Sequence, residues 1–193
     1  MIEENFLPST IKLFRYYKSL GDKTIAVLND EQLYYQPTTE SNSVAIIIQH
    51  LSGNMLSRFT DFLTTDGEKE WRNRDGEFEI ASRVQNTETR NEVELLKAEW
   101  EKGWACLFKA IEPLTEEDLS KTIYIRNEGH TSAEALQRQL THYAYHIGQV
   151  VYIGKMLLNE NWKSLSIPRN KSADFNKERF DKDKSRKHFT DRL

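Results

Sequence analysis

Residues 142–149 read HYAYHIGQ and lie within a segment whose apolar pattern predicts one long helix. His142 and His146 are four residues apart, a spacing that turns a helix by about 400° and advances it by about 6 Å. Both imidazoles therefore leave one face of the helix, where they can share a metal ion. A third histidine, His50, lies far upstream in another apolar stretch, VAIIIQHLSGN. The sequence thus predicts a three-histidine metal site with an open coordination position that faces a pocket.

Four apolar segments predict long helices, and together they indicate an all-α helical bundle. The last helix begins at Thr131 or Ser132 and ends near residue 158, and Glu134 completes a capping box with Thr131. In each of the other segments, apolar side chains recur at three- and four-residue steps. Those helices are expected at residues 6–28, at residues 44 to 62 or 63, and at residues 89–111.

The second and third helices are joined by a long connection, TTDGEKEWRNRDGEFEIASRVQN, at residues 64–86. It carries two glycines, many charges and scattered apolar side chains that include Trp71, Phe78 and Ile80. Connections of this length are usually functional or partly structured. Two interpretations stay open: a lid across the bundle that is held down by its aromatic residues, or a surface excursion without a role. Before the last helix, LTEEDLS predicts a helical turn, and TIYI followed by NEG predicts a short extended piece and a turn.

Length and charge favour a single domain over residues 1–193, with a core at about 5–168 and a charged tail at about 169–193. Residues 162–168 are expected to pack on the bundle and the final stretch to be mobile. The net charge of −3 gives no basic footprint for nucleic acid. The longest apolar run, residues 44–48, is too short to span a membrane.

The N-terminus and the cysteine usage favour a cytoplasmic protein. The first ten residues, MIEENFLPST, carry acids where a signal peptide needs bases. The single cysteine, Cys106, rules out an internal disulfide framework and agrees with a reducing compartment. We expect Cys106 to pack as a small apolar side chain.

The metal interpretation competes with an ordinary structural one. Two histidines at this spacing occur by chance on many helices, and a buried histidine is more often a hydrogen-bonded core residue than a ligand. In favour of a metal, the three histidines lie in apolar helical segments. The other two, His130 and His188, fall in a loop and in the charged tail and are expected at the surface.

The number of ligands then sets the chemistry. Three neutral imidazoles leave a tetrahedral zinc ion one ligand short, and water takes that place. The ion lowers the pKa of this water, or of a bound thiol. Imidazole also suits nickel, copper and iron. Because the ligands must be neutral, the metal is expected to dissociate below a pH of about 6. Gln149 and Asn54 are candidates for supporting a ligand or contacting a substrate, with plain structural hydrogen bonding as the alternative.

At this point the chain resembles the DinB/YfiT-like superfamily of metalloenzymes. His50, within IIIQHLSGN, is similar to the histidine in the middle of the second long helix of that superfamily. His142 and His146, followed by Gly148 and Gln149, are similar to its HxxxH and GQ in the fourth long helix. The loop DGEKEWRNRDGEFE and the tail WKSLSIPRNKSADFN resemble one bacterial branch within the superfamily.

The resemblance implies a four-helix bundle with a long crossover between helices 2 and 3 and an extended C-terminal tail. It implies a homodimer and a divalent metal, usually zinc or nickel, held by His50, His142 and His146. Related proteins include thiol S-transferases that use bacillithiol-type thiols and a mycothiol-dependent maleylpyruvate isomerase. The implied function is therefore a metal-dependent thiol S-transferase or small-molecule hydrolase, with a small molecule such as a low-molecular-weight thiol as substrate.

Two other classes of function stay open. One is a non-catalytic bundle that binds a metal or a small ligand, for example in a stress response. The other is a structural protein with core histidines and no metal.

Overall fold

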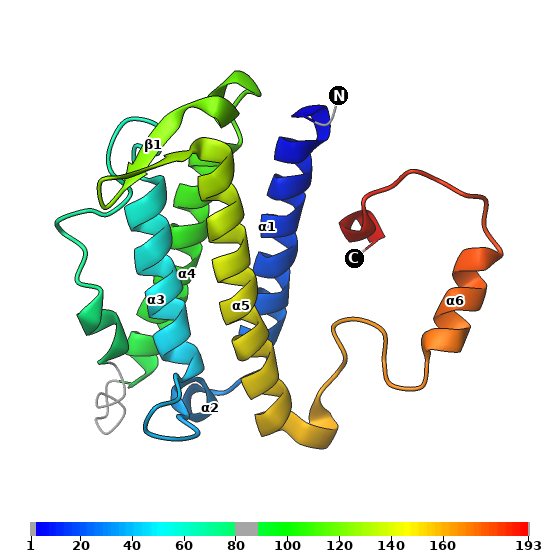
Figure 1. Cartoon of the computed structure of the whole chain (residues 1–193). Helices are drawn as coiled ribbons and strands as arrows, with labels where there is room; N and C mark the ends of the chain where they lie inside the picture. The colour runs from blue at the N-terminus through cyan, green and yellow to red at the C-terminus, as the bar shows by residue number, and fades with distance from the viewer. Residues whose placement is uncertain (1–2, 80–88, 193) are drawn as a thin grey trace.

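The computed structural model describes residues 3–79 and 89–192, which are mostly helical (Figure 1). The four long helices are α1 (Glu3–Ile25), α3 (Val44–Phe59), α4 (Thr89–Ile111) and α5 (Ser132–Leu158). There are also two shorter described helices, α2 (Asp30–Tyr34) and α6 (Ser172–Phe180). The strands β1 (Thr122–Ile125) and β2 (Glu128–Thr131) form an antiparallel hairpin. Single 3₁₀ turns are η1 (Asp75–Phe78), η3 (Glu117–Ser120), η4 (Asn159–Asn161) and η5 (Phe189–Arg192). Apart from the hairpin, the predicted all-α class is confirmed.

The chain directions explain why α3 and α4 need a long connection. In Figure 1, α3 and α4 both rise from the end where α2 lies, whereas α1 and α5 run the opposite way. The most extensive packing is between α3 and α4 and between α1 and α5. Because α3 and α4 are parallel neighbours, the chain must return along their length. Gly103 of α4 permits their close approach, since a Cβ there would lie 2.9 Å from Cα of Ser52.

Large aromatic side chains in the core set the rotation of α5. Tyr143 is fully buried, and its ring lies 5.8 Å from Trp104 of α4 and 5.9 Å from Phe14 of α1 between centroids. Ile147 and Val150 continue this buried stripe along α5. A neighbouring residue is displaced by about 100° around a helix. The positions just before Tyr143 and Ile147 therefore face sideways, toward α3.

The first predicted helix is three residues out of register at both ends. It was expected at residues 6–28, whereas α1 spans Glu3–Ile25 and a separate helix, α2, follows. Asn29 caps α2. Its side-chain oxygen accepts a hydrogen bond from the backbone N–H of Gln32, and the side-chain oxygen of Gln32 accepts one from the backbone N–H of Asn29. This reciprocal cap begins a new, short helix directly after the segment that was expected to be the first long helix.

The other long helices agree better with their predictions. The helix predicted to reach residue 62 or 63 ends at Phe59, because Asp61 takes a left-handed conformation with φ 51°. The last helix begins as predicted, with the side chains and backbones of Thr131 and Glu134 forming the expected capping box. Its predicted end at residue 158 is also confirmed.

The predicted extended piece and turn form a complete antiparallel hairpin. Arg126 and Asn127 make its turn with φ values of 57° and 62°, as a two-residue turn with this twist requires. Both backbone N–H groups donate to the carboxylate of Asp66, at 2.9 and 2.8 Å. The N–H of Gly67 donates to the carbonyl oxygen of Tyr124 at 2.8 Å. These bonds attach the connection after α3 to the hairpin.

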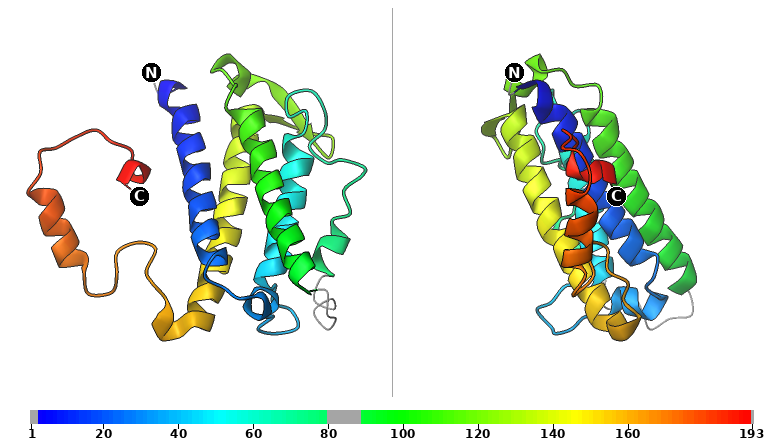
Figure 2. Two further views of the ribbon diagram at one scale, coloured as in Figure 1. Left: turned by 180° about the vertical axis from the view of Figure 1, so that it is seen from behind. Right: turned by 90° about the vertical axis from the view of Figure 1, so that its right-hand side faces the viewer.

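The C-terminal tail departs from its prediction. Of residues 162–168, Trp162 packs on α5, with a ring carbon 3.3 Å from the Cβ position of Gly154, whereas most of the others are exposed. The chain then leaves the helical core on the α1 side (Figures 1 and 2), because it offers little apolar surface to bury. It forms α6 and returns to α1, where His188 Nε2 lies 3.1 Å from Ser9 Oγ.

Among the described helices, none is both long and apolar enough to cross a membrane.

Candidate metal centre

The three predicted histidines meet between α3 and α5. Their ring centroids are 5.3 Å apart for His50 and His142, 5.0 Å for His50 and His146, and 4.8 Å for His142 and His146. The Nε2 atoms of His50 and His142 are 3.3 Å apart. One ring nitrogen from each histidine lies within 4.8 Å of the others, so the group could hold a metal ion.

The remaining two histidines lie elsewhere, as predicted, although neither is fully exposed. His130 belongs to β2 instead of a loop, and its Nε2 lies 3.4 Å from Nη1 of Arg138. His188 is half-buried against α1.

Glu77 fixes the orientation of His50. Its Oε2 lies 2.9 Å from Nδ1 of His50, and both side chains are buried. A carboxylate only accepts hydrogen bonds, so Nδ1 carries the proton and Nε2 presents its lone pair toward His142. A carboxylate behind a histidine in this way is a common arrangement in metal sites. The sequence did not single out Glu77. The available signal was Gly53, on the same face as His50, where a Cβ would overlap Oε1 of Glu77.

Arg72 holds Glu77 in place with a forked ion pair. Arg72 Nε donates to Oε1 at 2.8 Å and Nη2 donates to Oε2 at 2.9 Å. Burial opposes ionisation of Glu77, but the hydrogen bonds from His50 and Arg72 outweigh it and hold its pKa below the usual value. Glu77 is therefore a charged acceptor at neutral pH.

The environment keeps the two histidines of α5 neutral. Burial, followed by the neighbouring His146 and His50, lowers the pKa of His142 to about 3. Burial and His50 lower the pKa of His146 to about 4, although the hydrogen bond to Gln149 opposes this. The neutral form is the one that binds metal. Protons therefore compete for these two imidazoles only at a pH below the ordinary histidine pKa.

Gln149 and Asn54 both lie near the histidines. Oε1 of Gln149 accepts a hydrogen bond from Nδ1 of His146 at 3.0 Å, which leaves Nε2 of that ring free as well. Asn54 accepts a hydrogen bond from the Tyr143 hydroxyl at 3.0 Å. Gln149 thus contacts a candidate ligand directly, whereas Asn54 is held by a core residue.

A cavity of about 480 Å³ opens above the histidines. We call it the histidine pocket, and it is lined by His50, His142 and His146, by Asn54, Phe78 and Gln139, and by Arg58, Arg72, Arg74, Arg126 and Arg138. Gln139 and the arginines were not singled out by the sequence. Their side chains converge because α3, α5, the hairpin turn and the connection meet at this point.

The connection after α3 therefore forms one wall of the histidine pocket and is not a surface excursion. Phe78 packs against His50, with 5.0 Å between ring centroids. Trp71 is 60% exposed, so of the aromatic residues considered for holding a lid down, Phe78 packs inward and Trp71 does not. Ile80 and the rest of the predicted loop to residue 86 lie outside the described residues.

Cys106 takes no part in this pocket. Its Sγ lies 3.7 Å from Oγ1 of Thr60, and the side chain is half-buried against the apolar core. This agrees with the predicted role as a small apolar residue.

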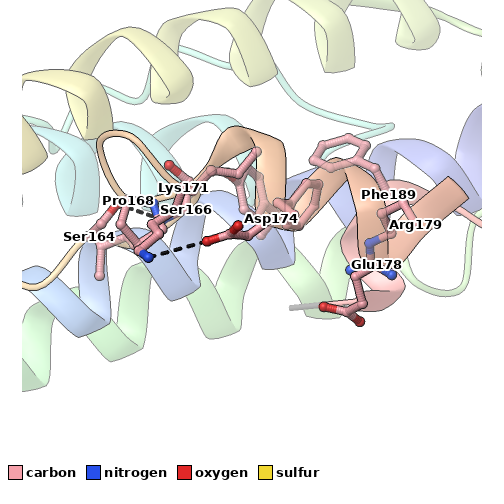
Figure 3. A pocket seen from close by; sticks show the side chains of 12 residues that line it. Ser164, Ser166, Pro168, Lys171, Asp174, Glu178, Arg179 and Phe189 are labelled. Carbon is pink, nitrogen blue, oxygen red and sulfur yellow. Dashed lines mark hydrogen bonds and ion pairs between the residues drawn. The ribbon is translucent and has the colours of Figure 1, made fainter. Parts of the chain in front are cut away.

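A larger hollow of about 660 Å³ lies between the tail and α1, where Tyr16 lines it (Figure 3). In it, Lys171 pairs with Asp174 at 3.2 Å, and the guanidinium group of Arg179 covers the ring of Phe175. None of the three clustered histidines lines this hollow. The histidine pocket, although smaller, is the better candidate for chemistry.

Comparison with known proteins gives one match. No curated protein and no solved structure matches the chain. A family model described as "Protein of unknown function (DUF1572)" matches residues 1–171. This match covers the helical core and all three clustered histidines, and the chain therefore belongs to the DUF1572 family.

Proposed function

We propose that the protein is a metal-dependent enzyme, either a thiol S-transferase that uses a bacillithiol-type thiol or a small-molecule hydrolase. Its divalent metal, zinc or nickel, is held by His50, His142 and His146. The observation that carries this proposal is the convergence of the three imidazoles at the base of an open pocket.

The donor set fits a divalent ion. Lowered pKa values keep His142 and His146 neutral. Glu77 and Gln149 occupy Nδ1 of His50 and His146, so the Nε2 atoms remain for the metal. Three neutral ligands leave the full charge of the ion and an open position, which together lower the pKa of a water or thiol that binds there.

The described residues of the histidine pocket favour a nucleophile that comes from outside the protein. No serine, threonine, cysteine, lysine or tyrosine is among the described residues that line the histidine pocket. Cys106, the single cysteine of the chain, packs elsewhere. A covalent enzyme intermediate on a side-chain hydroxyl or thiol is therefore disfavoured. Water and a thiol co-substrate are the nucleophiles that remain, which correspond to the hydrolase and the S-transferase.

We also assign the family to the DinB/YfiT-like superfamily, with a four-helix bundle over a single domain. The parallel α3 and α4 with their long connection support this assignment. A cytoplasmic homodimer is part of the same proposal. Its support is a stripe on α5 of Tyr145, Tyr152 and Met156, which are 64%, 70% and 42% exposed and which a second copy would cover.

The first test is the metal content of protein purified without a histidine tag. A matched triple variant carries His50→Ala, His142→Ala and His146→Ala. The proposal expects nearly one zinc or nickel per chain in the native protein and none in the variant. Absence of metal from both, even after incubation with zinc and nickel, would refute the metal site.

The second test is activity. Metal-loaded protein should accelerate conjugation of a low-molecular-weight thiol to an electrophile, or hydrolyse small esters and amides. Loss of catalysis in His146→Ala with only a small loss of thermal stability would support an enzyme, since the helical core can stand without the metal. If the native protein binds metal but shows no turnover, and His146→Ala unfolds readily, the protein is instead a non-catalytic metal protein.

A further inference from the structure

The histidine pocket is unusually rich in arginine. Five arginines line it, and they come from α3, from the connection, from the hairpin turn and from α5. No acidic side chain is among the described lining residues. Among the described residues, the carboxylates that pair with these arginines are Glu68, Glu77 and Asp75. Five positive charges against three negative ones leave an excess of two, before any metal is counted.

Two of the arginines are committed to structural partners. The side chain of Arg72 is only 2% exposed, and two of its nitrogens donate to the two carboxylate oxygens of Glu77. Arg58 is 6% exposed, donates from Nη2 to Glu68 at 3.1 Å, and reaches the carbonyl oxygen of Gly67 with Nη1. Together they fix the connection against α3.

The other three arginines stand at the mouth of the pocket. Arg126 shares Glu68 at 2.8 Å and is 55% exposed. Arg74 is 53% exposed and lies 3.6 Å from Asp75, a carboxylate that is 93% exposed and therefore screened by water. Nη1 of Arg138 lies 3.4 Å from Nε2 of His130, and no ion pair to a described carboxylate is seen for Arg138. Arg74 and Arg138 can therefore accept a further anionic partner.

Two buried polar atoms of the lining also lack a partner. They are Nε of Arg58 and Oε1 of Gln139, whose residues are 6% and 3% exposed. Buried polar atoms in native proteins almost always find a partner, and leaving one without costs free energy. Of these two atoms, only Nε of Arg58 is a donor that an anion could partner, because Oε1 of Gln139 is itself an acceptor and needs a donor group.

We propose that the histidine pocket binds a small organic anion through a carboxylate or phosphate group held by Arg74 and Arg138. Guanidinium groups match the planar fork of such oxyanions better than any other side chain. The volume of about 480 Å³ suits a small molecule. This inference rests on the proposed function only in placing the reacting end of the ligand near the histidines, because anion binding at the arginines needs no metal.

The test measures binding to protein from which metal has been removed with EDTA, and to the same protein reloaded with zinc. Succinate and inorganic phosphate are titrated by calorimetry at low ionic strength, with neutral succinamide as the uncharged counterpart. The variants are Arg138→Gln and Arg74→Gln. Arg169→Gln is the matched control, because it removes the same charge from an exposed tail residue outside the histidine pocket.

The proposal expects either anion, but not succinamide, to bind the metal-free protein. Each pocket variant should weaken binding by about tenfold, the loss expected for one charge-assisted hydrogen bond, and Arg169→Gln should leave it unchanged. Added salt should weaken binding further.

Three results would overturn it: no binding of either anion, binding that appears only with zinc and ignores both pocket variants, or an equal loss in Arg169→Gln. Zinc content measured on the same samples separates the two proposals. Protein that takes up zinc but binds no anion refutes only this inference, whereas protein that binds anions but no zinc refutes only the metal site.

Discussion

Replacing Glu77 by glutamine tests whether the buried carboxylate behind His50 supports a metal site. The change keeps the size of the side chain and removes its charge. Glu77 accepts from Nδ1 of His50 at 2.9 Å and holds the two nitrogens of Arg72 that donate to it. Glutamine retains one acceptor oxygen, so the imidazole can keep its position while the charge that raises its basicity is lost.

Two effects of different size follow from this geometry. Removing a partner behind a metal-bound histidine typically costs about 10- to 100-fold in metal affinity, or about 1.4–2.7 kcal/mol. Because glutamine can still accept one hydrogen bond, we expect a loss near tenfold. Separately, Arg72 is 2% exposed and loses its closest counter-charge. Breaking a buried ion pair from one side costs about 3–5 kcal/mol of unfolding free energy, so the variant should also be less stable.

Zinc affinity is measured by titration in competition with a chromophoric chelator. The free energy of unfolding is measured by urea unfolding of the metal-free protein. Glu68→Gln is the matched control: Glu68 pairs with Arg58 and Arg126 and, at 3.7 Å, with Arg72, but with none of the described histidines. It should lower stability and leave zinc affinity unchanged. The reasoning is refuted if folded Glu77→Gln binds zinc as tightly as the native protein, or if Glu68→Gln weakens zinc binding equally.

Three further changes probe the parts around the site. Metal-free protein should lose stability as the pH falls from about 7 to about 4.5. The unfolded chain takes up protons near the ordinary histidine pKa of 6.5, whereas folded His142 and His146, with pKa values of about 3 and about 4, stay neutral. Replacing both by glutamine should flatten this dependence in urea unfolding. Gly103→Ala should cost about 1–3 kcal/mol, because its Cβ meets the backbone of α3. Gly148→Ala, with no atom within 4 Å of its Cβ, should instead stabilise the helix by about 0.5–1 kcal/mol, and chemical denaturation separates the two. Asp66→Ala should cost about 1–3 kcal/mol and speed hydrogen exchange at the two turn amides that it holds.

The long helices were predictable because each repeats its apolar residues over many turns. The cap formed by Thr131 and Glu134 was also readable, since both partners lie within one turn of sequence. The hairpin was harder, because its turn places Arg126 and Asn127 in the left-handed region without the glycine that usually marks such turns. Its conformation depends on the carboxylate of Asp66, which is about sixty residues away.

The candidate site also combines residues that local sequence predicts with residues that only contacts between distant segments reveal. His142 and His146 were found because helical periodicity alone places them on one face, and His50 because a polar residue in an apolar helix stands out. Residues 60–79 have no such period, so nothing local distinguishes Glu77 from its charged neighbours. Glu77 reaches His50 because the connection crosses α3 at Gly53, where the missing side chain leaves room for its carboxylate. The histidines therefore follow from helix geometry, whereas the charge around them follows from how a non-repeating segment is tied to the hairpin. That segment and the hairpin also supply the pocket's exposed arginines at positions 74 and 126. The helices therefore place the three histidines, whereas the connection, the hairpin turn and α5 together place the exposed arginines at positions 74, 126 and 138 around them.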